Sequence, residues 1–104
     1  MTFLVGFDGS NTSMEALDLA CTYAKALHAD IEIVTSMEEG DSKDVTQIRS
    51  AEEKLERAET LAKARGISVQ THLLIRGMSP GEDVVQFATE NQVDALFIGV
   101  RRRS

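Results

Sequence analysis

Short apolar runs alternate with amphipathic stretches along the whole chain. The first run, residues 3–7, is continuously apolar, which is typical of a strand buried on both faces of a sheet. Turn-forming residues 8–10 end this strand. Thr12, followed three positions later by Glu15, forms a capping-box pattern and predicts the start of a helix. One face of that helix is apolar: Leu17, Ala20, Ala24 and Leu27.

The alternation continues through the middle of the chain. Residues 31–34 predict a second strand, and the acidic, glycine-containing stretch 38–44 predicts a loop. A helical period then covers residues 44–65, and Gly66 stands at the expected C-cap. Residues 67–75 alternate between apolar and mostly polar positions, which is typical of an edge strand.

The last unit begins at a turn over residues 77–80, with Pro80 in the first turn of the next helix. Asn91 predicts the end of that helix, and residues 95–98 predict an apolar strand that closes on Gly99. Three side chains of the helix are expected to face inward: Val84, Val85 and Ala88.

This order of elements, β-α-β-α-β-α-β, predicts an α/β domain with an open, doubly wound parallel sheet and right-handed crossovers. At 104 residues the chain has room for a single domain, which we assign to residues 1–104. The last apolar strand has no helix behind it in the sequence. Either the protein continues beyond Ser104, which we expect, or a partner subunit covers that edge.

Composition narrows the classes of function. A net charge of −6 disfavours a general nucleic-acid-binding surface. No stretch has the roughly 18 apolar residues of a membrane span, and the N-terminus does not have the basic lead of a signal peptide. We therefore expect a cytoplasmic protein with neither nucleic acid nor membrane as a partner. Cys21 is the single cysteine, so it forms no intrachain disulfide, and we expect it to be a small core residue.

The predicted topology suggests where a ligand would bind. In an open parallel sheet, ligands bind outside the carboxyl ends of the strands, where the strand order reverses. If the first and fourth strands are neighbours, Asp8 and Gly99 border that crevice. A carboxylate can accept hydrogen bonds from ribose hydroxyls, and a glycine lets backbone N–H groups approach a phosphate. Asp8 has an alternative role, in which it hydrogen-bonds the amides at the start of the following helix. Residues 101–103, all arginine, are either a solvated chain end or a local anion site.

Other kinds of site have little support. The chain contains neither the P-loop nor the dinucleotide-binding glycine motif. His28 and His72 have no cysteine or carboxylate at metal-ligand spacing, so we expect no metal site. Ser10 and Ser13 are better explained as helix-start hydroxyls than as nucleophiles, because no histidine is placed to act as their base.

Three segments together resemble one protein family. Residues 3–13, 76–84 and 93–99 are similar, in order and spacing, to the opening, the segment before the third helix and the fourth strand of universal stress protein domains. The resemblance covers nearly the whole chain. It implies a Rossmann-like fold of the adenine nucleotide alpha hydrolase type, with strand order 3-2-1-4 and with the family's fifth strand and fourth helix missing here. It also implies that the full-length form is a homodimer.

The resemblance further implies a nucleotide site. ATP-binding members carry a phosphate motif of the form G-x2-G-x9-G-[ST]; Gly99 matches its first glycine, and Arg102 stands in place of the second. Asp8 corresponds to the aspartate that holds the ribose, and Ser36 to the strand end that contacts adenine. The implied nucleotide-binding residues are Asp8, Gly9, Ser36, Gly99, Val100, Arg101 and Arg102.

Three functions can be compared on this basis. The leading interpretation is a stress-response or regulatory module that binds an adenine nucleotide, ATP with Mg²⁺, and is not an enzyme. Arg102 instead favours the same fold without a nucleotide, acting through homodimerisation or a protein partner. An enzyme that uses ATP to activate a substrate would need an S-G-G-x-D-S type loop after the first strand, which residues 8–11 do not supply.

Overall fold

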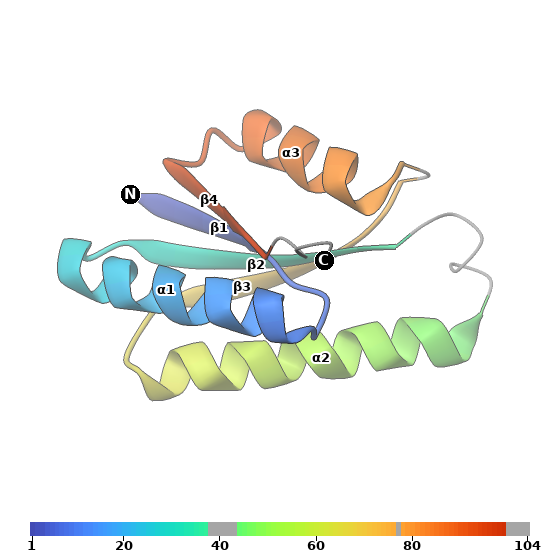
Figure 1. Cartoon of the computed structure of the whole chain (residues 1–104), viewed down its shortest axis with the longest axis horizontal. Coiled ribbons are helices and arrows are strands. Elements are labelled where there is room, and N and C mark those ends of the chain that lie inside the picture. Colours follow the sequence, from blue (N-terminus) through green and yellow to red (C-terminus); the bar gives the residue numbers. More distant parts are fainter. Residues whose placement is uncertain (38–43, 77, 100–104) are drawn as a thin grey trace, which may run out of the picture.

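The computed structural model describes residues 1–37, 44–76 and 78–99. Within these residues, seven elements follow one another in the predicted order (Figure 1). They are β1 (Thr2–Gly6), α1 (Asn11–Leu27), β2 (Asp30–Met37), α2 (Val45–Ala64), β3 (Val69–Ile75), α3 (Pro80–Glu90) and β4 (Ala95–Ile98). None of the helices among the described residues is both long and apolar enough to cross a membrane.

The four strands form one parallel sheet in the order β3-β2-β1-β4, which confirms the predicted fold. β1 lies in the middle, so Val5 is opposite Ile33 of β2 on one side and Phe97 of β4 on the other. β3 lies at an edge, as its partly polar pattern predicted. The carboxyl ends of β1, β2 and β4 therefore meet at one side of the sheet.

Helices cover both faces of the sheet. Figure 1 shows α1 and α2 on one face and α3 on the other. The larger part of the core lies under α1 and α2, where Phe3 and Val5 of β1 pack with Leu17 and Leu55. The smaller part lies under α3, where Leu4, Val34 and Val84 are buried. Successive residues of β1 thus point into different layers, which explains why residues 3–5 are all apolar.

Two details of the helices differ from the prediction. The N-cap of α1 is Ser10 rather than Thr12, because the Ser10 side chain accepts a hydrogen bond from the Ser13 N–H. Val85 does not face inward but is 51% exposed. α3 packs through Val84 and the residues three and four positions later, which turns Val85 about 100° away from the sheet.

The C-terminal boundaries of the helices agree with the turn chemistry of the sequence. Arg65 caps α2, and Gly66 follows it with a φ of 78°, a left-handed conformation that glycine adopts without strain. Asn91 caps α3, as predicted. The acidic loop expected at residues 38–44 lies outside the described residues except for Asp44, which is the N-cap of α2.

Cys21 is a buried residue of α1, as expected, and this location makes a testable prediction. Burial raises the pKa of the Cys21 thiol, so little thiolate is present near neutral pH. We expect the native protein to react far more slowly with a disulfide reagent such as DTNB than the urea-unfolded protein. Equal rates in the two states would contradict the burial of this helix face.

Candidate functional site

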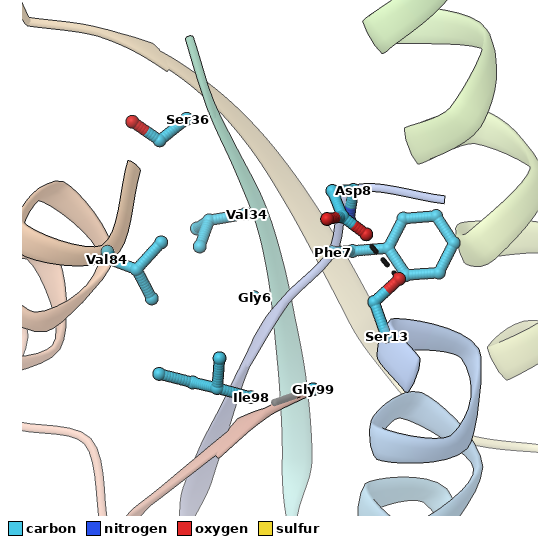
Figure 2. Close-up of a pocket in the computed structure, with 10 residues that line it drawn as sticks. Gly6, Phe7, Asp8, Ser13, Val34, Ser36, Val84, Ile98 and Gly99 are labelled. Atoms are coloured by element: carbon cyan, nitrogen blue, oxygen red, sulfur yellow. Dashed lines mark hydrogen bonds between the residues drawn. The ribbon is translucent and has the colours of Figure 1, made fainter. Parts of the chain in front are cut away.

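A cavity of about 120 Å³ opens at the carboxyl ends of the central strands. It lies between the α1 side and the α3 side of the sheet edge, so residues from both faces contribute to it (Figure 2). It is lined by Gly6, Phe7, Asp8, Ser13, Val34, Ser36, Gly81, Val84, Ile98 and Gly99. We call it the sheet-end pocket.

The sheet-end pocket brings together three of the predicted site residues: Asp8, Ser36 and Gly99. β1 and β4 run side by side in the same direction, so the residues that follow them meet at its mouth. Gly9 is not among the lining residues. Val100, Arg101 and Arg102 lie outside the described residues. The part that each of these residues plays in binding stays a prediction.

The β1–α1 loop is ordered by its own short polar side chains. The Asp8 carboxylate accepts a hydrogen bond from the Ser10 N–H at 2.8 Å. The Asp8 N–H in turn donates to the Ser13 hydroxyl at 3.4 Å, the bond drawn in Figure 2. Asp8 therefore helps to start α1, which was its alternative role. A carboxylate has about four acceptor sites, so this role is compatible with binding a ligand as well.

Gly9 has a conformational role in the same loop. Its φ is 84°, which L residues with a side chain rarely adopt. A Cβ at this position would lie 2.9 Å from Cδ of Lys54. The side chain of Lys54, a residue of α2, lies beside the loop. The family resemblance implies that Gly9 is a site residue, which stays a prediction, and the structure shows the part of Gly9 in shaping the turn.

Gly99 allows β4 to approach the start of α1 closely. A Cβ on Gly99 would lie 2.4 Å from the carbonyl carbon of Thr12 and 2.6 Å from the Ser13 nitrogen. Both are backbone atoms, which cannot rotate away as a side chain can. The absence of a side chain at residue 99 is therefore a requirement of the packing at the mouth of the sheet-end pocket.

The α3 side of the sheet-end pocket is apolar. Figure 2 shows Val34, Val84 and Ile98 gathered on this side of Gly6. A Cβ on Gly6 would lie 3.4 Å from a methyl group of Val84, so the glycine leaves part of the space open. Such a wall suits a flat apolar or aromatic group of a ligand.

An ionic network centred on a buried carboxylate, which the sequence did not predict, adjoins this wall. Asp83 in the first turn of α3 is 0% exposed. One of its carboxylate oxygens accepts from Nε of Arg76 at 2.6 Å, and the other accepts from the Ser36 hydroxyl at 2.6 Å. Arg76 also donates to Glu90 at 2.8 Å. The hydrogen bonds to Glu90 and to Asp83 raise the pKa of Arg76, so its guanidinium remains charged.

The two histidines lie elsewhere in the fold. His28 is the C-cap of α1, and Nε2 of His72 on β3 lies 2.9 Å from a carboxylate oxygen of Glu32 on β2. Within residues 1–37, 44–76 and 78–99, no group of three or more His, Cys, Asp or Glu side chains could hold a metal ion.

Comparisons with known proteins agree with this architecture. The model of the universal stress protein family matches residues 1–104. The solved structure of a universal stress protein from Archaeoglobus fulgidus has 31% sequence identity and a TM-score of 0.90, and the match covers 100% of this chain and 79% of that one. No match was found among curated proteins.

Two further solved structures contain nucleotides. The universal stress protein from Archaeoglobus fulgidus in complex with dAMP has 30% identity and a TM-score of 0.87, over 97% of this chain and 82% of that one. A universal stress protein in complex with cAMP has 30% identity and a TM-score of 0.72, over 92% of this chain and 69% of that one. Both the family match and these folds extend over nearly all of the sequence, and the chain belongs to the universal stress protein family.

Proposed function

We propose that this universal stress protein domain binds an adenine nucleotide in the sheet-end pocket. The observation that carries the proposal is the meeting of Asp8, an apolar wall and Gly99 around one cavity at the carboxyl ends of β1 and β4. Similar proteins of the family in complex with dAMP and cAMP support it.

Each part of a nucleotide has a suitable partner in the sheet-end pocket. The base would lie against the apolar wall formed by Val34 and Val84. The ribose hydroxyls would donate to the Asp8 carboxylate. The first N–H groups of α1 have no partners within the helix and favour an anion, so the phosphates would lie toward that end. Drug-sized ligands occupy cavities of roughly 300 Å³ or more, so a cavity of about 120 Å³ would enclose the base and leave the phosphates near solvent.

The finer identity of the ligand follows from the resemblance. We propose ATP, with Mg²⁺ bound through the phosphates, as the physiological form. Val100, Arg101 and Arg102 are the residues expected beside the phosphates. An arginine at position 102 would supply positive charge where the family motif has glycine.

We further propose that the domain is a regulatory module and not an enzyme. Both histidines lie outside the lining of the sheet-end pocket, so neither is placed to activate Ser10 or Ser13. The expected role of the nucleotide is to stabilise one state of the protein. From the family resemblance we also propose a cytoplasmic location and, for the full-length form, a homodimer.

Replacing Asp8 with alanine is expected to weaken binding of ATP and AMP by roughly ten- to one-hundred-fold. That is the cost of losing hydrogen bonds from ribose hydroxyls to a charged acceptor. Isothermal titration of the wild-type and Asp8→Ala proteins with each nucleotide, with and without Mg²⁺, measures the effect directly.

Asp44→Ala is the matched control for this experiment. Asp44 accepts a hydrogen bond from the Thr46 N–H at 2.9 Å, the same kind of helix-start bond that Asp8 makes, but at α2. This variant should bind nucleotide as the wild type does. If Asp8→Ala binds nucleotide as tightly as Asp44→Ala, the role proposed for Asp8 is wrong. If the wild type binds no adenine nucleotide, the nucleotide proposal itself is wrong. The module that works only through protein partners would then be the better interpretation.

A further inference from the structure

The polar side chains that line the sheet-end pocket have one property in common. Each hydroxyl has already donated its hydrogen within the protein: Ser36 to Asp83 at 2.6 Å, and Ser13 to the carbonyl of Ser10 at 2.9 Å. A serine hydroxyl has a single hydrogen to donate, and an ionised carboxylate such as Asp8 has none. Among the described lining residues, the side chains therefore offer a ligand only hydrogen-bond acceptors.

The direction of the Ser36 hydroxyl is fixed by Asp83. This carboxylate is fully buried, and its two oxygens are satisfied separately, one by Arg76 and the other by Ser36. If Ser36 turned its hydrogen toward a ligand, a buried carboxylate oxygen would lose its partner, which is costly. Figure 2 shows the hydroxyl turned to the side of the pocket formed by α3, where Asp83 lies.

Ser36 also lies where the base is expected. It is at the end of β2, whereas Gly99 follows β4, and these two strands flank β1 on opposite sides. The start of α1, which favours phosphate, contacts Gly99. A nucleotide with its phosphates at that end would place its base toward Val34 and Ser36.

From these contacts we propose that Ser36, with its hydrogen held by Asp83, determines the base preference of the sheet-end pocket. The inference rests on the proposed nucleotide binding. An oxygen that can only accept and that faces position 6 favours a purine with a 6-amino group, which donates there, over a 6-oxo purine, which presents a second acceptor there and carries its N–H at N1 instead. Asp83 does not line the sheet-end pocket, so its part is to position the Ser36 hydroxyl.

Substitution of Asp83 by asparagine makes a distinctive prediction. Nε of Arg76 must donate to an oxygen, so the amide oxygen of Asn would face Arg76 and its NH₂ group would face Ser36. The amide would then donate to the Ser36 oxygen and release the serine hydrogen toward the ligand. Asp83→Asn should therefore shift preference toward the 6-oxo purine, which simple loss of structure would not do.

The test compares AMP with inosine 5′-monophosphate (IMP) by isothermal titration. These ligands share ribose and phosphate, so the ratio of their affinities isolates the base. The wild type is expected to prefer AMP by roughly ten-fold, the scale of one mismatched polar contact. Ser36→Ala should reduce the ratio of AMP affinity to IMP affinity to near one, whereas Ser36→Thr should preserve the wild-type ratio. Asp83→Asn should lower the ratio further than Ser36→Ala does.

Asp18→Asn is the matched control for charge, because Asp18 pairs with Arg65 at 2.7 Å on the exposed side of α1. It should leave the ratio at the wild-type value. Binding of AMP with an unchanged ratio in Ser36→Ala would overturn the role of Ser36 while leaving the proposed function intact. Equal binding of AMP and IMP by the wild type would also overturn the role of Ser36 and leave the proposed function intact. Binding of neither ligand by the wild type would overturn the proposed function and this inference together.

Discussion

Replacing Asp83 with alanine is expected to lower the free energy of unfolding by about 3 kcal/mol. The substitution removes a fully buried carboxylate and leaves two partly buried donors, the Ser36 hydroxyl and Nε of Arg76, without their acceptor. It also removes the contact that joins the first turn of α3 to the ends of β2 and β3. Urea unfolding followed by circular dichroism would measure the change as a lower midpoint.

Asp18→Ala separates the effect of burial from that of the ion pair. The Asp18–Arg65 pair has an N···O distance of 2.7 Å, close to the 2.6 Å of Asp83–Arg76, but the Asp18 side chain is 77% exposed and that of Asp83 is 0% exposed. Exposed pairs contribute about 0–1 kcal/mol, because water and salt screen them. Asp18→Ala should therefore cost no more than about 1 kcal/mol. If the two variants lost equal stability, the network behind the sheet-end pocket would have no special energetic role.

The fold could be predicted because its signals are local. The apolar run at residues 3–7 indicated a strand buried on both faces, and β1 is covered by helices on both faces in the middle of the sheet. The mixed pattern of residues 67–75 indicated an edge, which is where β3 lies. Each of these patterns indicates which side of a strand is exposed to water and which side is buried. That difference between exposed and buried sides is a local signal for the position of the strand in the sheet.

Two predictions were wrong, the N-cap of α1 and one inward-facing residue of α3, and in both cases two neighbouring residues were almost equally suitable. Ser10 and Thr12 are both good N-cap residues, and the loop geometry set by Asp8 decides in favour of Ser10. Val84 and Val85 are both apolar, but α3 turns Val84 toward the sheet, and Val85, about 100° further round the helix, is exposed. In both cases the outcome depends on the path of the backbone, which composition does not specify.

The network of Asp83 could not be predicted from its position in the sequence. An acidic residue in the first turn of a helix is normally explained by the helix dipole and is expected to be exposed. Its burial depends on Ser36, which is 47 residues away in the sequence. Long-range polar pairs of this kind have no periodic signal.

For the candidate site, topology was a better guide than motifs. The carboxyl ends of neighbouring parallel strands had to bring Asp8 and Gly99 to one edge of the sheet, and both line the sheet-end pocket. The two roles predicted for Asp8 are compatible, because the residue that accepts the Ser10 N–H bond also lines the sheet-end pocket. The bond that orders the loop is observed, and the contact of Asp8 with a ligand stays a prediction.

Replacing Gly99 with alanine is expected to destabilise the domain by about 3 kcal/mol and to abolish nucleotide binding. The new methyl group would lie 2.4 Å from the carbonyl carbon of Thr12, so either β4 or the start of α1 must move. Because backbone atoms cannot change rotamer, this clash can be removed only by a shift of the backbone, which costs stability. Urea unfolding and an AMP titration of the same sample would measure both effects.

Gly81→Ala provides the control for the effect on stability of losing a glycine; because Gly81 lines the sheet-end pocket, this variant is not a control for nucleotide binding. Gly81 lies in the first turn of α3, and a Cβ there meets nothing within 4 Å. Alanine at a position of this kind leaves the free energy of unfolding unchanged or raises it by up to about 1 kcal/mol, because it lowers the conformational entropy of the unfolded chain. Unfolding of Gly99→Ala at the wild-type midpoint would mean that β4 does not approach α1 as closely as described. The mouth of the sheet-end pocket would then be wider, and Gly99 would not be needed to place a phosphate against the start of α1.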